Sequence, residues 1–524
     1  MSKASEMAKV SAKGGFHFFW GLVVSTVISA VGTIIMARFL LPSEYGLYTI
    51  ALAAPNLIAM FRDWGIDSAM IKYTAQYNAE NKPVKNILAA GLMFEAVMGS
   101  ALSLGSFLLS GFLATTVFQR PDITPLIQIA SFTLLTNALM TALQAAFTGM
   151  EKLAPNSLTL VCRSTIKTVL VSALVILGLG AYGATVGTTI AGLIASLIGI
   201  LLLWTIYRNL PKPNDGEDGP GIGENIRLML KYGLPLSISS ILSAFRMQFY
   251  NFLVVIYTSN TIIGNYSVAT NFVVLITFFA TPITIMLFPA FSKLDPHKER
   301  ETLQNVFQYS VKYSALIVVP ATIAIMVLAQ PAISTLFGDK YTEAPLFLTL
   351  LAISHLYVAF GSLSTGNLIN GQGETKLNLK LTLITTAIGV TLSLILIPRF
   401  GIIGLIATML ISEIPSLIIA LNLIRRKYTV TVDWTSSAKI LLSSTVAATV
   451  TYAILSQLIF SSWIKLIIGL AIFLPAFLLS ILLTRTFDRS DINNLREMTS
   501  ELGPISNVLN PILNIFEKLV TSLR

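Results

Sequence analysis

The sequence has little charge and almost no cysteine. Only 11% of its 524 residues are Asp, Glu, Lys or Arg, whereas 54% are apolar and the mean hydropathy is +0.76. A soluble domain carries about 25% charged residues, so an ordinary water-soluble protein is excluded. The single cysteine, Cys162, excludes a disulfide framework, and the three histidines form no His-Glu-x-x-His motif. We therefore expect no metal site and no cofactor.

The chain also lacks a Gly-Lys dipeptide, which a Walker A loop requires. No polar segment is long enough to form a nucleotide-binding domain, so we expect no direct use of ATP. The net charge of +10 would suggest a nucleic-acid partner in a soluble protein. In a membrane protein, the positions of the charges decide what that excess means.

Fourteen long apolar stretches, separated by short polar connections, run through the chain. A helix needs about 20 apolar residues to cross the hydrocarbon core, and a backbone in lipid must bond within its own helix. The pattern therefore predicts an all-α polytopic membrane protein. The expected spans are 15–37, 46–66, 86–113, 123–148, 155–178, 182–206, 230–257, 262–290, 306–336, 344–369, 377–397, 401–424, 437–460 and 463–484.

The distribution of Lys and Arg predicts the orientation. If the spans alternate in direction, both termini and one set of connections hold 27 of the 35 cations, and the opposite set holds five. Cytoplasmic loops are enriched in Lys and Arg, so both termini are expected in the cytoplasm and the spans in the cell membrane. The remaining three, Arg163, Lys167 and Arg246, lie well inside spans. The charge excess thus reflects topology, and no nucleic-acid partner is expected.

A polar break divides the chain after the sixth span. Residues 207–225 read YRNLPKPNDGEDGPGIGEN, which is typical of a flexible linker. We expect an N-terminal six-helix bundle at 1–206, a cytoplasmic linker at 207–225 and a C-terminal six-helix bundle at 226–424. Two further transmembrane helices follow at 437–484, and then a cytoplasmic amphipathic tail at 485–524.

The two halves resemble each other, which predicts pseudo-symmetric bundles. With an even number of spans in each half, the repeats are parallel and a cavity is expected between them. The matching positions are Gly46 with Gly264, Tyr48 with Tyr266, and Tyr182-Gly183 with Phe400-Gly401, all 218 residues apart, and Gly149 with Gly371, 222 residues apart. This change of offset requires compensating insertions and deletions.

Four short motifs resemble a known family. Residues 37–48, ARFLLPSEYGLY, closely resemble the first outer loop of oligosaccharide flippases, the polysaccharide-transporter branch of the multidrug/oligosaccharidyl-lipid/polysaccharide exporter superfamily. Residues 63–66, DWGI, look like the end of their second span. Residues 370–376, NGQGETK, and 397–404, IPRFGIIG, look like signatures of their second half. The resemblance covers about residues 10–485.

The resemblance implies a flippase. It would move polyprenyl-phosphate- or polyprenyl-diphosphate-linked oligosaccharides to the outer leaflet by alternating access, for surface polysaccharide or glycoprotein assembly. Its partners would be this lipid-linked oligosaccharide, membrane lipid, and the glycosyltransferases or polymerase of the same pathway. Many relatives place an acid in the middle of the seventh span, where this chain has Tyr250-Asn251.

The three cations within spans are the first candidates for a binding site. Arg163 and Lys167 are four residues apart and share one helical face. An anionic head group can leave water only if its hydration is replaced, and a guanidinium matches phosphate oxygens. We expect Arg246, Arg163 and Lys167 to line a cationic chamber. Side chains near Arg246 would meet the sugars; these are Gln248, Tyr250 and Asn251.

Charged residues near span ends or alone in spans allow two interpretations each. Arg163 and Lys167 would alternatively reach the inner surface, or pair with Asp63 or Glu95. Arg62-Asp63, at the cytoplasmic end of the second span, is either an interfacial pair or a gate or entry site. Glu95 and Glu413 either bind a coupling ion or proton, or pair with a neighbour.

Two other functions compete with the flippase. A multidrug or organic-cation antiporter shares the superfamily's architecture, but usually has twelve spans and needs acids in its cavity. A membrane glycosyltransferase acts on the same lipid carriers, but needs acidic residues on a substantial outer loop, which this chain lacks. We therefore expect a transporter and not an enzyme.

Overall fold

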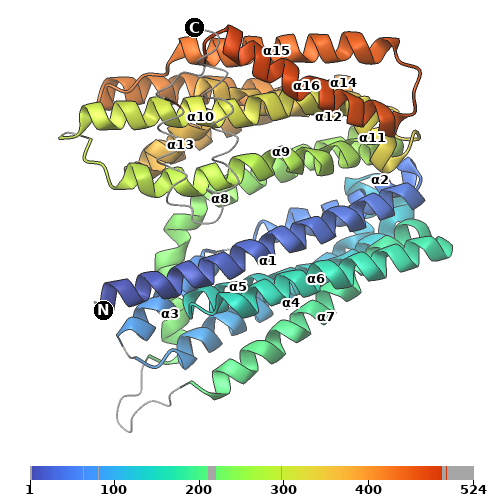
Figure 1. Cartoon of the computed structure of the whole chain (residues 1–524). Helices are drawn as coiled ribbons and strands as arrows, with labels where there is room; N and C mark the ends of the chain where they lie inside the picture. The colour runs from blue at the N-terminus through green and yellow to red at the C-terminus, as the bar shows by residue number, and fades with distance from the viewer. Residues whose placement is uncertain are drawn as a thin grey trace. The chain divides into compact units, whose positions relative to one another are not determined.

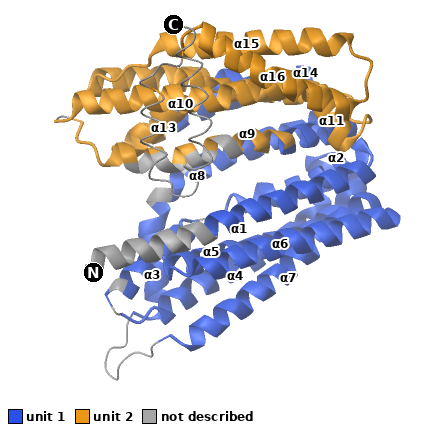
Figure 2. Cartoon of the chain, in the orientation of Figure 1, with its two compact units in different colours: residues 1–271, 382–412 blue, residues 272–381, 413–524 orange. Residues whose placement is uncertain are grey.

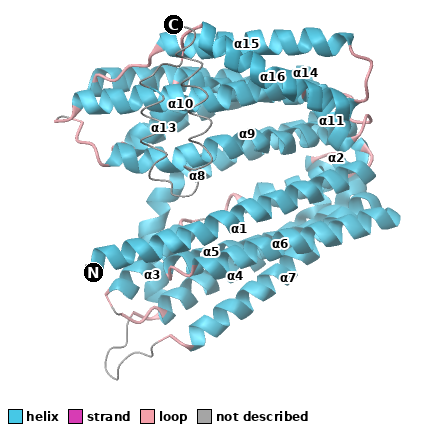
Figure 3. Cartoon of the chain, viewed as in Figure 1, coloured by secondary structure: helices cyan, strands magenta, loops and turns pink. Residues whose placement is uncertain are grey.

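The computed structural model describes residues 3–62, 64–80, 82–210, 220–296, 298–486 and 491. Within these ranges every regular element is a helix and there is no strand (Figure 3). The expected all-α class is therefore confirmed. Most of the linker, at 211–219, and the tail at 492–524 lie outside the described residues, so the amphipathic tail stays a prediction.

The helices follow one another with short connections (Figure 1). Three short turns, η1 (Leu113–Val117), η2 (Pro121–Ile123) and η3 (Val175–Leu179), and the longer 3₁₀ segment η4 (Ile353–Phe360) extend or join them. The α-helices are α1 (Lys3–Phe39), α2 (Pro42–Ala59), α3 (Ile66–Ala79), α4 (Lys85–Phe112), α5 (Thr124–Gly149), α6 (Leu153–Leu174), α7 (Gly180–Arg208), α8 (Ile222–Tyr257), α9 (Asn260–Ser292), α10 (Arg300–Val327), α11 (Ala329–Phe337), α12 (Ala344–Ala352), α13 (Ser362–Gly371), α14 (Thr375–Tyr428), α15 (Trp434–Gln457) and α16 (Ser462–Leu483).

Helix contacts divide the chain into two compact units (Figure 2). Unit 1 comprises residues 1–271 and 382–412, and unit 2 comprises residues 272–381 and 413–524. These limits differ from a division at the 207–225 linker, because α8, which follows the linker, packs on α2, α3 and α4 of unit 1. The bundles expected at 1–206 and 226–424 stay a prediction.

Eight helical stretches of the described residues are long and apolar enough to cross a membrane, or nine if the bent pair α12–α13 is one span. Two of them, Leu153–Arg208 and Thr375–Tyr428, contain 56 and 54 residues. At 1.5 Å per residue each measures about 80 Å, whereas the hydrocarbon core is about 30 Å thick. Each is broken at glycine with positive φ, and α6 and α7 pack side by side across the first break. The number of fourteen spans stays a prediction.

In unit 1, α6 packs along the length of α1 through small and polar residues. The Ser29 hydroxyl donates to the Ser164 hydroxyl at 3.0 Å, and the Thr168 hydroxyl donates to the Ile28 carbonyl at 3.0 Å. Small residues allow such close helix contacts in lipid. This contact fixes α6, the helix that carries Arg163 and Lys167.

In unit 2, α10, α15 and α16 share an apolar cluster that includes Val319, Ile440 and Phe473. Lys312 of α10 is a largely buried cation, and its Nζ lies 2.7 Å from a carboxylate oxygen of Asp491. The Asp491 side chain is almost completely buried. A buried ion is tolerated when a partner compensates its desolvation, so this cation is neutralised inside the protein.

Candidate functional site

The two cations of α6 remain inside unit 1. Arg163 and Lys167 are half-buried. The Arg163 guanidinium donates to the side-chain oxygen of Asn137 on α5 at 2.5 Å, and no described carboxylate pairs with it. Lys167, one turn along the helix, lines a cavity of about 50 Å³ with Ser29 and Thr33 of α1. Arg163 is therefore held by a neutral side chain, and Lys167 lines a cavity that has polar residues in its wall.

The polar residues of α8 lie on two sides of the helix. Arg246 and Tyr250 are four residues apart, whereas Gln248 and Asn251 occupy a different face at 3.6 residues per turn. The Asn251 amide donates to the Gln248 carbonyl oxygen at 3.3 Å. Tyr250 is buried, and its hydroxyl lies against the backbone of Gly389, where a β-carbon would overlap it.

Arg246 itself is half-buried and makes no hydrogen bond or ion pair with a described residue. Of the four expected residues of α8, Arg246 thus has no partner among the described residues, and Tyr250 packs into the helix interface. Gln248 and Asn251 contact each other.

Arg62 holds a buried ion-pair network at the α2–α3 bend. One guanidinium nitrogen lies 2.7 Å from Glu95 of α4 and donates to the Thr141 hydroxyl of α5 at 2.6 Å. Asp67 of α3 lies 3.7 Å away. Glu95 is completely buried, so this contact supplies the counter-charge that a buried carboxylate needs. Asp63, the other expected gate residue, lies outside the described residues.

Equivalent residues of the two sequence repeats meet where α2 and α9 begin. The hydroxyls of Thr49 and Ser267, which are 218 residues apart, form a hydrogen bond of 2.9 Å. A β-carbon on Gly46 would overlap the backbone of Asn260, and one on Gly264 would overlap the backbone of Pro42. The two close approaches are related by the same offset of 218. The helix ends therefore cross with local two-fold symmetry, and the matching glycines permit the crossing.

Arg120 reinforces this crossing, which we call the repeat contact. Its guanidinium donates to the Asn260 side chain and, at 2.5 Å, to the Thr258 carbonyl. Burial lowers the pKa of Arg120, because desolvation disfavours its charged form. The Asn271 amide also donates to the Tyr45 hydroxyl at 3.0 Å. From the sequence, Arg120 is one of the five cations in the connections on the side opposite the termini. The matched glycines were the signal that could have revealed the contact.

The glycine break between α6 and α7 matches the glycine break inside α14, but in a different register from the expected one. Gly180 has φ 52° and ψ −137°, and Gly401 has φ 55° and ψ −127°. Three residues later, Gly183 and Gly404 both approach the carbonyl groups of the preceding helix. The expected pairing of Tyr182-Gly183 with Phe400-Gly401 is therefore wrong by three residues. The observed offset of 221 is close to the 222 found for Gly149 and Gly371. The alignment of the two repeats therefore does not have to change back to an offset of 218 after these residues.

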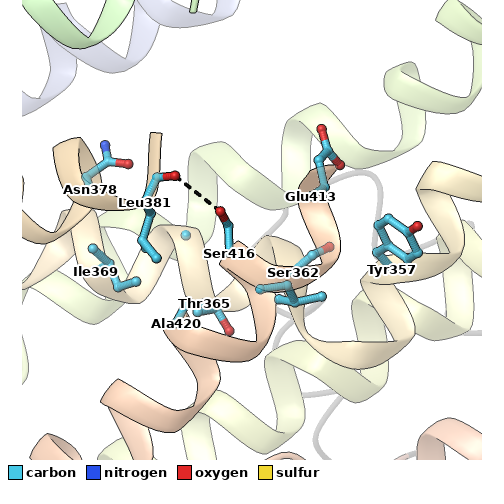
Figure 4. A pocket seen from close by; sticks show the side chains of 11 residues that line it. Tyr357, Ser362, Thr365, Ile369, Asn378, Leu381, Glu413, Ser416 and Ala420 are labelled. Carbon is cyan, nitrogen blue, oxygen red and sulfur yellow. Dashed lines mark hydrogen bonds between the residues drawn. The ribbon is translucent and has the colours of Figure 1, made fainter. Parts of the chain in front are cut away.

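Glu413 lines a pocket of about 190 Å³ within unit 2 (Figure 4). The pocket lies between α13, α14 and η4, and Glu413 and Ser416 project from the same part of α14. The Ser416 hydroxyl donates to the Leu381 carbonyl at 3.1 Å. Sequence reasoning found Glu413 but missed its polar neighbours, because they come from three separate segments.

Comparison with known proteins identifies the family. The family described as "Polysaccharide biosynthesis protein" matches residues 35–346. The chain belongs to this family. Proteins of both bacteria and archaea are similar to this chain. Lipopolysaccharide biosynthesis protein WzxC of Escherichia coli is 23% identical over 399 residues, which are 72% of this chain and 77% of WzxC. The probable low-salt glycan biosynthesis flippase Agl15 of Haloferax volcanii is 24% identical over 218 residues, 42% of this chain and 46% of Agl15.

The fold is shared with a solved flippase structure. Lipid II flippase MurJ, in an inward closed conformation, aligns with a TM-score of 0.70 at 16% identity, covering 89% of this chain and 98% of MurJ. Together with the apolar helices, these relatives identify this polysaccharide biosynthesis protein as a multi-pass membrane protein. The resemblance to oligosaccharide flippases, and thus to the exporter superfamily, is confirmed.

Proposed function

We propose that this protein is a flippase for polyprenyl-phosphate- or polyprenyl-diphosphate-linked oligosaccharides or polysaccharide repeat units. It would move them from the inner to the outer leaflet by alternating access, for surface polysaccharide or glycoprotein assembly. The observation that carries the proposal is the family match over residues 35–346. The flippases among its relatives support the same substrate class.

The embedded cations supply the chemistry that such a substrate needs. Arg163, Lys167 and Arg246 are half-buried and have no carboxylate partner among the residues that the structure describes. A cation within apolar helices costs at least a few kcal/mol when it faces lipid, so its retention without an acid favours a polar or anionic ligand. In our proposal these residues bind the phosphate while the prenyl chain stays in lipid. Gln248 and Asn251 would contact the sugars, and Tyr250 would reach the substrate only if its packing against Gly389 opens.

The proposed architecture is the one expected from hydropathy and charge. It has about fourteen spans, two pseudo-symmetric six-helix bundles, two additional C-terminal helices and both termini in the cytoplasm. With that orientation, the repeat contact lies on the outer side of the cell membrane. We propose that it closes the outer exit, because α2 and α9 cross there at backbone distance.

Arg62 and Asp63 lie toward the cytoplasmic side in this orientation. Because Arg62 bonds Glu95 and Thr141, we propose that it anchors the α2–α3 bend beside the inner entry. The same contact supports pairing, in place of ion coupling, for Glu95. The membrane potential would then drive flipping, since moving one negative charge outward yields about 2.3 kcal/mol per 100 mV when the inside is negative.

Deleting the gene and analysing the lipid-linked glycans tests the proposal. We expect one completed glycan lipid to accumulate on the inner leaflet. An unchanged lipid pool with altered drug tolerance would instead identify a multidrug antiporter. Accumulation of an incomplete glycan lipid would identify a glycosyltransferase.

The driving force has a separate test in proteoliposomes. Flipping that requires a sodium or proton gradient while the electrical potential is held at zero would contradict potential-driven transport. Glu95 and Glu413 would then return as candidate coupling acids.

A further inference from the structure

A pocket in unit 2 lies at the break of a discontinuous helix. The segments Ala344–Phe360 and Ser362–Gly371 are bent by 59° at a single residue, Gly361, whose φ is 81°. The broken pair contributes Tyr357, Ser362 and Thr365 to the pocket, and α14 contributes the opposite wall. Transporters use breaks of this kind to expose polar groups to a ligand inside the membrane.

The Thr365 hydroxyl in this pocket has no hydrogen-bond partner among the described residues. Thr365 is only 2% exposed, and its Oγ1 makes no hydrogen bond with any described residue. Most buried Thr hydroxyls of this chain donate to a carbonyl of their own helix, as Thr322 does to Val318 at 2.7 Å. A buried polar atom without a partner costs about 1–3 kcal/mol. Because this oxygen is buried, a ligand hydroxyl would remove that cost once the Thr365 side chain rotates its hydroxyl into the pocket.

The charge of the pocket argues against phosphate. Glu413 is a carboxylate, and none of the residues that line the pocket is Lys, Arg or His. A second anion would be repelled there. The remaining polar groups are neutral hydroxyls and the amide of Asn378, and the Ser416 hydroxyl donates to the Leu381 carbonyl.

The size and the walls argue for an organic ligand. A volume of 190 Å³ equals roughly six water molecules at about 30 Å³ each, which is far more than one dehydrated cation fills. Ile369, Leu417 and Ala420 form apolar parts of the wall. A sugar ring combines hydroxyls at its edge with apolar C–H faces, and it matches both kinds of surface.

We propose that this pocket binds a neutral sugar unit of the lipid-linked glycan. Glu413 accepts a hydrogen bond from one sugar hydroxyl, Thr365 bonds a second, and the apolar wall packs on the ring. The proposal rests on the proposed function and adds the part of the substrate that unit 2 recognises.

Binding to purified full-length protein in detergent micelles tests the inference. The probes are a prenyl diphosphate and the same carrier bearing one neutral hexose or N-acetylhexosamine, and isothermal titration gives each Kd. We expect at least one glycosylated carrier to bind about tenfold more tightly than the bare carrier, the gain from one charge-assisted hydrogen bond. Thr365→Val and Glu413→Gln should each reduce this preference by about threefold to tenfold, without changing the Kd of the bare carrier.

Matched variants separate binding from folding. Thr365→Val is isosteric and removes no protein hydrogen bond, so its thermal unfolding should match the wild type. Thr322→Val makes the same change at a buried threonine of α10 and should keep the sugar preference.

The outcomes distinguish the two proposals. Wild-type protein that binds neither kind of carrier contradicts the proposed function itself. Equal binding of bare and glycosylated carriers, or an intact preference in both pocket variants, overturns only the sugar site. Loss of a sodium or proton response in Glu413→Gln with the sugar preference intact would also overturn it, in favour of an ion site.

Discussion

Unit 1 and unit 2 neutralise embedded charges of opposite sign. In unit 1 the buried acid Glu95 is paired with Arg62, whereas the cations Arg163 and Arg246 have no carboxylate partner in the described part of the chain. In unit 2 the embedded cation Lys312 is paired with Asp491. The acid Glu413 instead lines a pocket without any cationic lining residue.

This contrast matches the two ends of a lipid-linked glycan head group. The phosphate end is anionic and suits unpaired cations, and the sugar end is neutral and rich in hydroxyls. We therefore propose a division of labour in which unit 1 binds the phosphate and unit 2 binds the sugar.

The largest expected effect comes from locking the repeat contact. The hydroxyls of Thr49 and Ser267 are 2.9 Å apart, so cysteines at both positions can form a disulfide with little backbone movement. We expect the oxidised double variant Thr49→Cys/Ser267→Cys, made in a Cys162→Ser background, to lose export completely. Reduction should restore it. The contact has to open if, as proposed, it closes the outer exit during alternating access.

The two single cysteine variants are the control for this lock. Each should export glycan normally under oxidation, as measured by surface glycan in a deletion strain. Normal export by the cross-linked double variant would show that the contact stays closed throughout transport.

Charge reversal at Arg163 or Arg246 should have the next largest effect. Losing a charge-assisted hydrogen bond costs about 1.5–3 kcal/mol, and a new carboxylate adds repulsion. We expect export to slow by up to about 100-fold. Binding of the bare prenyl diphosphate and of the glycosylated carrier should both weaken. This loss for both carriers distinguishes the unit 1 variants from the unit 2 pocket variants.

Lys380→Glu provides a matched control, because Lys380 is an exposed cation of α14. Its export should stay close to that of the wild type. If Arg163→Glu and Arg246→Glu also exported like the wild type, the phosphate assignment of unit 1 would be lost.

The paired acid of unit 1 should matter for stability more than the pocket acid of unit 2. Arg62→Met leaves Glu95 buried without its counter-charge, and breaking such a pair costs about 3–5 kcal/mol. Arg62→Met/Glu95→Met should recover much of that loss. Glu413→Gln, at an exposed position, should change stability by about 0.5 kcal/mol or less. Unfolding in detergent measures the stability of all three variants. Equal losses of stability in Arg62→Met and Glu413→Gln would contradict the expected difference between the paired acid of unit 1 and the pocket acid of unit 2.

The sequence could predict the helical class, the repeat at Gly46 and Gly264, and the three embedded cations, because these depend on composition and spacing. It could not predict which embedded charges are paired. Arg62 and Glu95 are 33 residues apart, and nothing in their local sequences links them. The partner of Arg163, the neutral Asn137, is equally remote in the chain.

The pocket was hidden for a different reason. Residues 344–369 read as one apolar span, since hydropathy is insensitive to the bend at Gly361. The register error at the second turn has a similar origin. Matching residue types aligned Gly183 with Gly401, whereas the backbone conformation aligns Gly180 with Gly401.

The smallest effects should come from one glycine of each unit. Gly46→Ala, at the repeat contact of unit 1, forces a methyl group into the backbone of Asn260 and should cost about 1–3 kcal/mol. Gly366→Ala, in the pocket wall of unit 2, meets no atom within 4 Å. Because Gly366 lies inside α13, it should stabilise the protein by about 0.4–1 kcal/mol. Thermal unfolding in detergent compares the two. Opposite signs are expected, since close packing in unit 1 excludes a side chain that the open pocket of unit 2 accepts; a neutral Gly46→Ala would mean that the helices separate at the repeat contact easily.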